Sequence, residues 1–477
     1  MRLFSLLKNI NCRIFGNSMI EIAGLYHKDT EVKDNGLFFC LRGTRVDGTN
    51  FVNSAIKNGA VAIVCEQEIP NLRGVTQIIV KNAREAMSLI ACRFFGYPAQ
   101  KLKIIGVTGT NGKTTITNML ASVLQKANKK VAVVGTNGVF FKGNKFETNM
   151  TTPDPIEFQQ YLSLMVKSKI EYVCVEVSAH AIDLHKIDGI KFEVVIFTNL
   201  TEDHLDYFKT MDNYFLAKSK LFSKRYAKFA VLNKDDYYSC LLSESINLPY
   251  VTYSNSSEAD FEASNITTEK DGQTFDFNGI QKISINMLGK FNISNALASI
   301  ATLSVLEISK EDIALGLKEM CQVAGRFNSY VINDVTIIID YAHTPDGLKN
   351  ILTAAKEIAG ENNLYSVFGC GGNRDAQKRA IMGEISNVLA DFSIITTDNP
   401  RFESASKIAK DIVRGINSNR YLIELDRSVA IRKAFNMAKP KDVIVVAGKG
   451  VENYIEENGV KIPYSDFAEV EKIRRNL

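Results

Sequence analysis

The stretch KIIGVTGTNGKTTITNMLASVLQKA, residues 103–127, reads as a strand, a glycine-rich turn and a helix. Its turn consists of Gly109, Thr110, Asn111, Gly112, Lys113, Thr114 and Thr115. Glycines let backbone N–H groups approach phosphate oxygens, a helix start favours an anion, and a lysine neutralises the outer phosphates. A threonine after the lysine can place its hydroxyl on Mg²⁺. The stretch therefore predicts a nucleoside triphosphate site, although Val107 stands where the strict P-loop pattern has glycine.

Apolar runs on both sides of this stretch predict an α/β protein of three domains. Residues 1–100 hold short strands among helical stretches, and we expect them to form an N-terminal α/β domain. Residues 101–324 carry continuous apolar runs, which are typical of central parallel strands covered on both faces. In residues 325–477 each expected strand ends in a loop rich in Gly, Asp, Asn or His, as in a doubly wound sheet. We expect a central P-loop ATPase domain with a mostly parallel sheet, followed by a Rossmann-like domain.

Composition argues against several other classes of protein. The 477 residues carry a net charge of +4 with acids and bases interspersed, too weak a bias for binding nucleic acid or a membrane surface. No apolar run approaches the roughly 18 residues of a membrane helix, and the first residues do not read as a cleavable leader. The eight cysteines lack CxxC or CxxH spacing, which favours buried free thiols in a reducing compartment. We expect a cytoplasmic monomer that acts on small molecules.

Three polar segments accompany the glycine-rich turn: EVSAH at 176–180, NLTEDHLD at 199–206 and NYFLAKSKLF at 213–222. Together they resemble the Mur ligase family, whose members form amide bonds with ATP and Mg²⁺. The resemblance implies four catalytic residues, namely Lys113, Glu176, His204 and Lys218. It also implies four metal ligands, namely Thr114, Glu176, His204 and, if carbamylated, Lys218. Composition alone would make His204 a helix-cap or core histidine and Lys218 a solvated lysine.

The segment LGKFNISNALA at 288–298 resembles the adenine side of the family's nucleotide site, which implies that Asn295 contacts the base. A helix start capped by Asn292 or Ser294 would explain the same residues, and both interpretations can hold together.

Two further segments resemble the phosphate and ribose sides of that site. Gly325-Arg326-Phe327 matches the hinge whose arginine reaches the nucleotide phosphates, although Asn328 stands where the family usually has glutamate. The segment DYAHTPD at 340–346 matches the ribose-side loop, with Asp340 as the acceptor for the hydroxyl groups.

GCGGNRD at 369–375 and DNPR at 398–401 indicate one branch of the family. In members that add meso-diaminopimelate, the DNPR arginine grips the far carboxylate, because a guanidinium suits a carboxylate and repels an ammonium. An Asx-Pro turn would explain DNP but not the arginine that follows it. The implied amino-acid-binding residues are Arg374, Asp398, Asn399, Arg401, Gly448 and Glu452.

The resemblance makes residues 1–100 an N-terminal UDP-binding domain, and the UDP-peptide site combines matches with departures. The implied contacts are Thr151, Thr152, Ser178 and Lys186. Lys186 stands where arginine is common, and Leu184 where glutamine is usual. Lys28-Asp29-Thr30 replaces the family's Asp-Ser-Arg, and Val451 replaces the histidine of its GKGHE motif. These departures leave the ATP and magnesium residues in place and leave UDP binding open.

The resemblance implies a ligase of peptidoglycan synthesis that joins meso-diaminopimelate to UDP-N-acetylmuramoyl-L-alanyl-D-glutamate through an acyl phosphate. One alternative is a related ligase for L-lysine, another amine or another carboxylate, including folylpolyglutamate synthase, against which DNPR and GCGGNRD argue. Another alternative is a nucleotide-binding protein without catalysis, which the retention of Lys113, Glu176, His204 and Lys218 disfavours.

Overall fold

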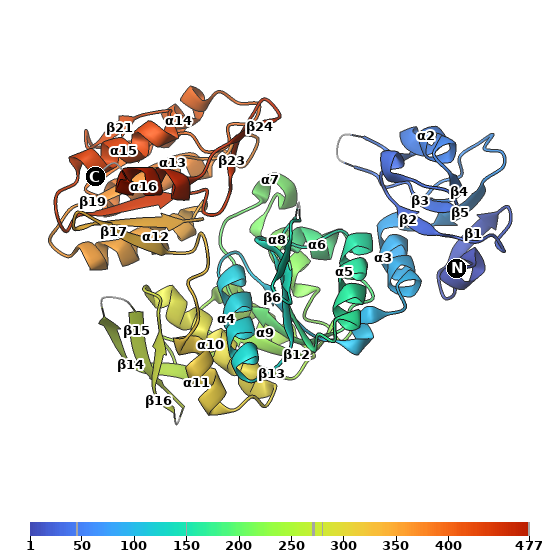
Figure 1. The fold of residues 1–477 in the computed structure, drawn as a ribbon, viewed down its shortest axis with the longest axis horizontal. Helices are drawn as coiled ribbons and strands as arrows, with labels where there is room; N and C mark the ends of the chain where they lie inside the picture. The colour runs from blue at the N-terminus through green and yellow to red at the C-terminus, as the bar shows by residue number, and fades with distance from the viewer. Residues whose placement is uncertain (44–45, 149, 270–271, 279, 476–477) are drawn as a thin grey trace.

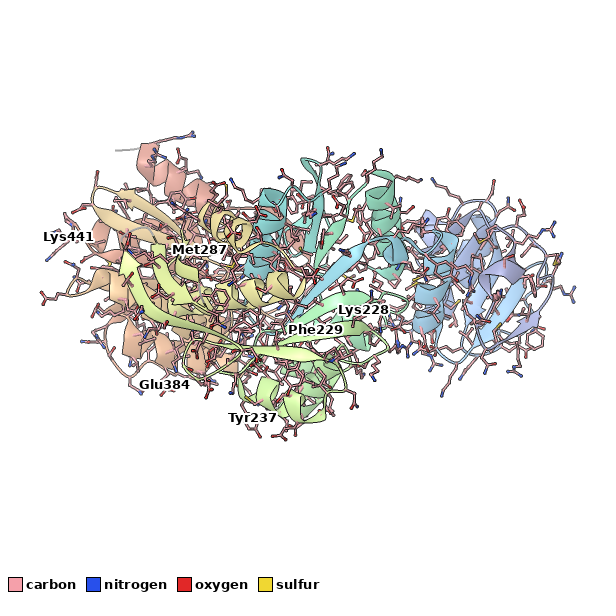
Figure 2. All side chains as sticks on the ribbon, turned by 90° about the horizontal axis from the view of Figure 1, so that it is seen from below. Lys228, Phe229, Tyr237, Met287, Glu384 and Lys441 are labelled. Carbon is pink, nitrogen blue, oxygen red and sulfur yellow. The ribbon has the colours of Figure 1, made fainter. Side chains whose placement is uncertain are left out.

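The computed structural model describes residues 1–477 apart from 44–45, 149, 270–271, 279 and 476–477. Its described strands form sheets of five, eleven, six and two strands. The three large sheets follow one another along the chain, from the blue N-terminal part through the green and yellow centre to the orange and red C-terminal part (Figure 1). Figure 2, from below, shows the N-terminal part at one end of the long axis. Within the described residues, no helix combines the length and apolar character that crossing a membrane requires.

The N-terminal sheet has the order β1-β5-β4-β3-β2, with only β1 antiparallel to its neighbour. Its elements are α1 (Leu3–Leu6), β1 (Cys12–Phe15), β2 (Gly24–Tyr26), η1 (Asp29–Glu31), β3 (Gly36–Phe39), η2 (Gly48–Phe51), α2 (Val52–Lys57), β4 (Ala60–Cys65), β5 (Thr76–Val80), α3 (Ala83–Phe94) and η3 (Pro98–Lys101). Helix α3 begins after Asn82, whose side chain accepts hydrogen bonds from the backbone N–H groups of Arg84 and Glu85. The buried face of α3 packs on this sheet.

The central sheet is mostly parallel, in the order β16-β15-β14-β13-β12-β11-β6-β10-β7-β8-β9. Its strands are β6 (Lys103–Thr108), β7 (Val131–Gly135), β8 (Gly138–Phe141), β9 (Asn144–Phe146), β10 (Tyr172–Glu176), β11 (Phe192–Phe197), β12 (Ala227–Asn233), β13 (Tyr250–Ser254), β14 (Phe261–Glu269), β15 (Gly272–Phe277) and β16 (Ile280–Ile285). Its helices are α4 (Lys113–Lys126), α5 (Pro155–Lys167), α6 (Ala179–Asp183), α7 (Leu205–Phe208), α8 (Met211–Ser219), α9 (Tyr237–Ser245), α10 (Lys290–Val305) and α11 (Lys310–Lys318).

Two apolar cores cover the two faces of the central strands. One core packs α5, α6 and α8 on the sheet, and the other packs α4, α10 and α11 on the opposite face. Because β6, β10 and β11 lie between these cores, their continuous apolar sequences are buried on both sides, which confirms the prediction for those strands. On the edge of the domain, Tyr237 at the start of α9 projects into solvent (Figure 2).

The C-terminal sheet has the order β17-β18-β22-β19-β20-β21, with β17 antiparallel to β18 and the other pairs parallel. Its elements, with a separate hairpin β23–β24, are β17 (Asn328–Ile332), β18 (Val335–Asp340), α12 (Pro345–Ala359), β19 (Leu364–Phe368), α13 (Lys378–Leu389), β20 (Phe392–Ile395), α14 (Ala405–Val413), β21 (Tyr421–Ile423), α15 (Arg427–Met437), β22 (Val443–Ala447), β23 (Tyr454–Glu457), β24 (Val460–Pro463) and α16 (Asp466–Arg475). Helices on both faces make this sheet doubly wound.

The domain limits expected at residues 100 and 324 remain a proposal. Residue 100 lies within η3, and residue 324 lies in the stretch between α11 and β17. All eight cysteines are free; five are buried, Cys12 and Cys240 are half-buried, and Cys321 is exposed.

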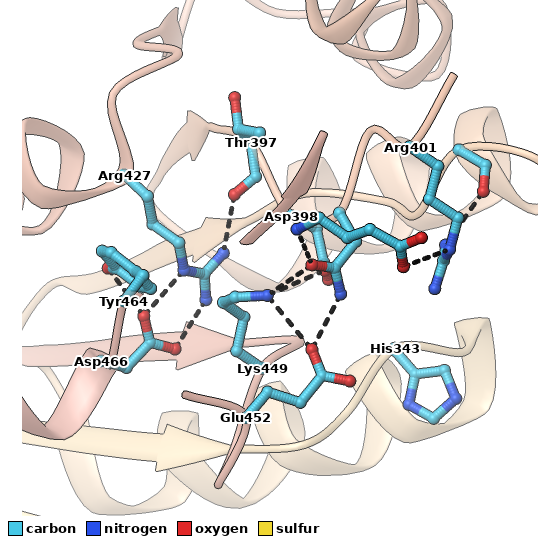
Figure 3. Close-up of polar contacts among 12 residues, drawn as sticks. His343, Thr397, Asp398, Arg401, Arg427, Lys449, Glu452, Tyr464 and Asp466 are labelled. Atoms are coloured by element: carbon cyan, nitrogen blue, oxygen red, sulfur yellow. Dashed lines mark hydrogen bonds and ion pairs between the residues drawn. The ribbon is translucent and has the colours of Figure 1, made fainter. Parts of the chain in front are cut away.

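A fully buried ion pair ties the last helix to the C-terminal sheet. Arg427 donates to both carboxylate oxygens of Asp466 at 2.8 Å and to the carbonyl of Ala447 at 2.9 Å (Figure 3). Tyr464 donates to the same carboxylate at 2.9 Å. Burial alone would lower the pKa of Arg427, but the Asp466 carboxylate raises it above its ordinary value. The pair therefore stays charged and fixes α15 and α16 beside β22.

We predict that Arg427→Ala destabilises the C-terminal domain by roughly 3–5 kcal/mol, because it leaves a buried carboxylate without its partner. Arg432→Ala is the matched control, since Arg432 joins the same two helices through Glu469 at 3.3 Å but its side chain is 49% exposed. That pair should contribute less than about 1 kcal/mol. Hydrogen exchange of β22 amides measures both effects; equal effects in the two variants would contradict the prediction.

Candidate functional site

A cavity of about 1050 Å³ lies between the carboxyl ends of the central strands and the C-terminal domain. The loops that follow β6 and β11 and the end of β10 line one side of it, and loops that follow β18, β19, β20 and β22 line the other. Among its lining residues are most of those singled out from the sequence, namely Thr110, Asn111, Gly112, Lys113, Thr114, Thr115, Thr151, Glu176, His204, Asn295, Arg326, Asp340, Arg374, Asp398, Asn399, Arg401, Gly448 and Glu452.

The glycine-rich turn has the geometry of an anion cradle. Helix α4 begins at Lys113 without a side-chain cap, which leaves its first N–H groups directed at the cavity. Gly112 has a φ of 88°, and a Cβ there would lie 2.6 Å from Asn295 Oδ1. At Gly109 a Cβ would lie 1.8 Å from Thr198 Oγ1. Both positions thus require glycine, and the cradle fits the phosphates of a nucleotide.

Two lysine amino groups meet at one carbonyl at the base of this cradle. Lys113 Nζ donates to the carbonyls of Gly109 at 2.9 Å and Thr110 at 2.8 Å, and Lys218 Nζ donates to Gly109 at 2.9 Å. Burial lowers the pKa of Lys113, and Glu176 opposes this shift. Burial, aided by the charge of Lys113, lowers the pKa of Lys218 well below its ordinary value. Lys218 lies behind the turn, with Nζ 4.6 Å from the Tyr214 ring.

The carboxylate of Glu176 is held by one threonine. Thr136 donates its backbone N–H to Oε1 at 3.0 Å and its hydroxyl to Oε2 at 3.1 Å. A Cβ at Gly135 would lie 2.1 Å from Oε1, so glycine is required beside this carboxylate as well. Glu176 ends β10 and lines the cavity with its orientation fixed.

His204 presents a neutral imidazole at the start of α7. Burial lowers its pKa, and the neighbouring carboxylate of Asp203 opposes this only in part. Nε2 lies 3.3 Å from Asp203 Oδ2, which leaves Nδ1 available to a metal ion. The ring of His180 packs edge-on against it at 4.9 Å.

These donors fit Mg²⁺. The carboxylate of Glu176 and the hydroxyl of Thr114 line the same cavity as His204, and oxygen atoms are the ligands that Mg²⁺ prefers. A lysine of lowered pKa, such as Lys218, has the unprotonated amine that forms a carbamate, and so could add further oxygen ligands.

The hinge arginine joins the C-terminal domain to the glycine-rich turn. Arg326 Nη2 donates to Thr114 Oγ1 at 3.0 Å, and its guanidinium lies 4.9 Å from the centre of the Tyr341 ring. Asp340 accepts from the backbone N–H groups of Phe327 at 2.8 Å and Ala342 at 2.7 Å, which ties the hinge to the loop after β18. Burial raises the pKa of Asp340, and Arg326 opposes the shift.

A second contact between the domains lies at Asn111, which donates to Asp346 at 2.8 Å. Nearby, Asn295 lines the cavity and donates to Asn292 at 3.1 Å. The alternative that Asn292 or Ser294 caps a helix start is wrong, because α10 begins at Lys290 after Gly289 and has no side-chain cap.

At the other end of the cavity, a polar network surrounds the DNPR segment (Figure 3). Asn399 donates to Glu452 Oε2 at 2.8 Å, and the buried Lys449 donates to the same oxygen at 3.1 Å. Arg401 donates to the carbonyl of Gly372 at 2.9 Å and pairs with Glu456 at 3.3 Å. Two further residues complete this end of the cavity. Arg374 is exposed, and a Cβ at Gly448 would lie 2.8 Å from Asp398 Oδ2.

Of the expected UDP-peptide residues, Thr151 alone lines this cavity. Thr152 is buried, donating to the carbonyl of Glu176 at 2.8 Å and accepting from the N–H of Ser178 at 3.1 Å. Ser178 caps α6 by accepting from Ala181 at 3.2 Å. These contacts hold the turn after β10.

Lys186 lies beside the N-terminal domain. Its ammonium pairs with Asp154 at 2.8 Å, and the same carboxylate faces His27 at 3.7 Å. Because His27 directly precedes the altered segment Lys28-Asp29-Thr30, that segment lies close to Lys186.

Several residues of the site were missed by sequence reasoning. They are Thr136, Asp203, Tyr341, His343, Lys378 and Lys449. Asp203, Tyr341, His343 and Lys449 fall inside segments quoted from the sequence, so proximity to a motif was the signal that could have found them. Thr136 and Lys378 lie outside every such segment, and their roles depend on contacts across the fold.

Comparisons with known proteins point to the same family in all three parts of the chain. Family models match in three places: the Mur ligase family, catalytic domain at residues 21–95, the Mur ligase middle domain at 107–303, and the Mur ligase, glutamate ligase domain at 325–450. UDP-N-acetylmuramoyl-L-alanyl-D-glutamate--2,6-diaminopimelate ligase 1 of Clostridium acetobutylicum is 43% identical over 92% of each chain. The corresponding ligase of Caldanaerobacter subterraneus subsp. tengcongensis is 40% identical over 99% of each chain. A solved structure of a ligase with this name, 29% identical, superposes with a TM-score of 0.68 over 97% of this chain and 96% of the other.

We predict that Thr136→Val weakens the binding of Mg²⁺–ATP by roughly 10–100-fold, the usual effect of removing a hydrogen bond that orients a metal ligand. The variant keeps the side-chain volume and loses only the hydroxyl that holds Glu176 Oε2. Thr136→Ser, which retains a hydroxyl, is the matched control and should bind like the parent. Titration calorimetry with Mg²⁺–ATP measures both; parental affinity in the valine variant would refute the role of Thr136.

Proposed function

The chain belongs to the Mur ligase family, and on that premise we propose that it joins meso-diaminopimelate to UDP-N-acetylmuramoyl-L-alanyl-D-glutamate with ATP. The observation that carries the proposal is a single cavity with a phosphate cradle at one end and the DNPR network at the other. A carboxylate activated at the cradle would then lie within reach of an amine bound at the network. This arrangement suits a ligase of peptidoglycan synthesis.

In the first step, the terminal carboxylate of the UDP-dipeptide attacks the γ-phosphorus of ATP, and ADP leaves. Lys113 and Arg326 would stabilise the charge that spreads over the transferred phosphoryl group. Burial lowers the pKa of Lys113, but a bound phosphate would raise it again and keep the ammonium charged. Bound Mg²⁺, held by Thr114, Glu176 and His204, would supply further positive charge to the phosphate oxygens.

In the second step, the amine attacks the carbonyl of the acyl phosphate, and inorganic phosphate leaves from the tetrahedral intermediate. Positioning carries most of this step, because the acyl phosphate is already activated. The hydrogen bonds from Arg326 to Thr114 and from Asn111 to Asp346 hold the two sides of the cavity together. A closed cavity protects the acyl phosphate from water.

The choice of amine would rest on Arg401 and Arg374. The guanidinium of Arg401 is fixed by Gly372 and Glu456, and its remaining N–H groups suit a carboxylate. Arg374 lines the same end of the cavity. Glu452 and Asp398 provide carboxylates for the neighbouring ammonium of diaminopimelate. L-lysine, which lacks the second carboxylate, would offer neither arginine a substrate carboxylate.

The UDP-dipeptide would reach the cradle from the side of Thr151 and Lys186. Lys186 offers a positive charge next to the N-terminal domain, where the UDP group of this substrate would bind. Lys28, which is exposed beside it, would replace the charge of the family's usual arginine. The alternative of nucleotide binding without catalysis predicts no dependence on this substrate.

The test is phosphate release with ATP and Mg²⁺, measured with and without the UDP-dipeptide and with diaminopimelate or L-lysine as the amine. The proposal requires release that depends on both the UDP-dipeptide and diaminopimelate, with the tripeptide product identified by mass. Release that depends on neither substrate would eliminate the ligase, and preference for L-lysine would overturn the choice of amine.

We predict that Arg401→Ala lowers kcat/KM for diaminopimelate by roughly 10–100-fold, because a hydrogen-bonded charge pair contributes about 1.5–3 kcal/mol. ATP binding should stay unchanged, since Arg401 lies at the opposite end of the cavity from the cradle. The matched control is Arg414→Ala, in the same domain, whose side chain is 76% exposed and pairs with Asp411. Unchanged turnover in Arg401→Ala would remove this residue from the amine site.

We predict that Lys218 carries a carbamate at neutral pH, because its buried amine has a lowered pKa and an unprotonated amine adds CO₂. Protein equilibrated with ¹³C-labelled bicarbonate should show a carbamate carbonyl signal by ¹³C NMR. Lys218→Arg, which keeps a cation but cannot form a lysine carbamate, should lack that signal and lose ligase activity. A signal that persists in the arginine variant would assign the carbamate elsewhere.

A further inference from the structure

Lys449 lies behind the amine end of the cavity with its side chain fully buried. Its neighbours Gly448 and Glu452 line the cavity, whereas Lys449 is not among the described residues that do so. Its ammonium has three polar partners: Asn399 Oδ1 at 3.1 Å, Glu452 Oε2 at 3.1 Å and Asp398 Oδ1 at 3.5 Å (Figure 3). A buried ammonium needs such partners, and all three belong to the amine site.

We propose that Lys449 is a positioning residue that determines the choice of amine, by orienting Glu452 and Asn399 and by limiting the negative charge of the amine end. The inference rests on the proposed function, which it deepens. Lys449 acts on the substrate through Glu452 and Asn399, without touching the substrate itself.

Lys449 orients the carboxylate of Glu452. Lys449 and Asn399 both donate to Oε2 of this carboxylate, at 3.1 and 2.8 Å. Among the described residues none donates to Oε1, so this oxygen is available to an ammonium in the cavity. Lys449 thus fixes which oxygen of Glu452 faces the substrate.

Lys449 is also linked to Arg401 through Asn399 and Glu456. Asn399 Oδ1 accepts from Lys449 and also from the N–H of Glu456 at 2.9 Å. The Glu456 carboxylate pairs with Arg401 Nε at 3.3 Å, and the Glu456 carbonyl accepts from the Arg401 N–H at 2.9 Å. One ammonium therefore supports both the carboxylate for the substrate ammonium and the guanidinium for the substrate carboxylate.

Lys449 also sets the balance of charge at the amine end of the cavity. The network holds the cations Lys449 and Arg401 and the carboxylates of Asp398, Glu452 and Glu456. Burial would raise the pKa of Asp398, but Lys449 and neighbouring cations hold it below its ordinary value, so Asp398 stays charged. Without the charge of Lys449, the amine end would be more negative by one charge, and the pocket would favour a more cationic ligand.

This balance discriminates between the two amines. Both diaminopimelate and L-lysine bring a side-chain ammonium, which Lys449 repels equally. Only diaminopimelate brings a carboxylate beside it, which Lys449 attracts. Removing the charge of Lys449 therefore weakens the binding of diaminopimelate relative to that of L-lysine. A residue that merely fills space would instead affect both amines alike.

The experiment compares kcat/KM for diaminopimelate and for L-lysine in the parent and in Lys449→Gln, Lys449→Met and Lys449→Arg. Glutamine keeps the polarity of the side chain and removes its charge, methionine removes both, and arginine keeps the charge. We expect the preference for diaminopimelate to fall by roughly tenfold or more in the glutamine and methionine variants, the scale of one charge–charge interaction. The arginine variant should keep most of the preference, and KM for ATP should not change in any variant.

A parental preference in Lys449→Gln, with activity on both amines lowered together or unchanged, would overturn the inference. Should the methionine variant fail to fold, as judged by circular dichroism, the glutamine variant decides the outcome. The parent enzyme separates the two levels of the proposal. Parental activity on neither amine would defeat the proposed function, whereas parental use of diaminopimelate with an unchanged preference in the variants would defeat only the assignment of Lys449.

Discussion

The structure depends most on the convergence of two buried lysine side chains, those of Lys113 and Lys218, on the single carbonyl of Gly109. The charge of Lys113 disfavours a second charge on Lys218, and burial removes the water that would screen the two. The pKa of Lys218 is therefore held well below its ordinary value, whereas the carboxylates of Glu176 and Asp203 favour the charged form of Lys113. A cavity floor with the Lys113 ammonium favours a polyanion such as a triphosphate. The turn requires glycine at two positions, because a Cβ at Gly109 or Gly112 would collide with the side chain of Thr198 or Asn295.

The C-terminal domain extends this arrangement, because its hinge brings a second cation, Arg326, to the same floor. Arg326 reaches Thr114 only while Asp340 holds the backbone of Phe327 and Tyr341 lies against the guanidinium. The loop that carries the amine site packs directly on this hinge: a Cβ at Gly450 would lie 2.8 Å from Tyr341 Cβ. The hinge at the phosphate site and the loop at the amine site thus pack so closely that Gly450 has no room for a side chain.

Much of this could be predicted from the sequence, for a physical reason. Continuous apolar strands such as β6 and β18 can be recognised from the sequence because they are buried on both faces. Glu176 and Asp340, which end strands of two different sheets, were found through their resemblance to family motifs. The half-buried strand β14, which alternates weakly with polar residues, gave no such signal. Thr136 and the Arg427–Asp466 pair were missed because their roles arise from contacts between residues 40 and 39 positions apart. The interpretation of Asn292 or Ser294 as a helix cap was wrong, because α10 begins earlier, at Lys290 directly after Gly289.

The departures from the family's motifs differ in what they change. Val451 replaces a histidine, but the contact at this position is made by backbone: a Cβ at Gly325 would lie 2.7 Å from the Val451 nitrogen, whatever side chain Val451 carries. Asn328 replaces a glutamate and still accepts a hydrogen bond from the N–H of Gly325, so the hinge keeps its anchor. Lys28, by contrast, is an exposed side chain whose ammonium pairs with Glu31 at 2.7 Å, and a substitution there changes the group that a ligand would meet. The hinge therefore keeps its contacts through the backbone of Val451 and the side-chain oxygen of Asn328, whereas Lys28 presents a changed side chain on the proposed uridine side.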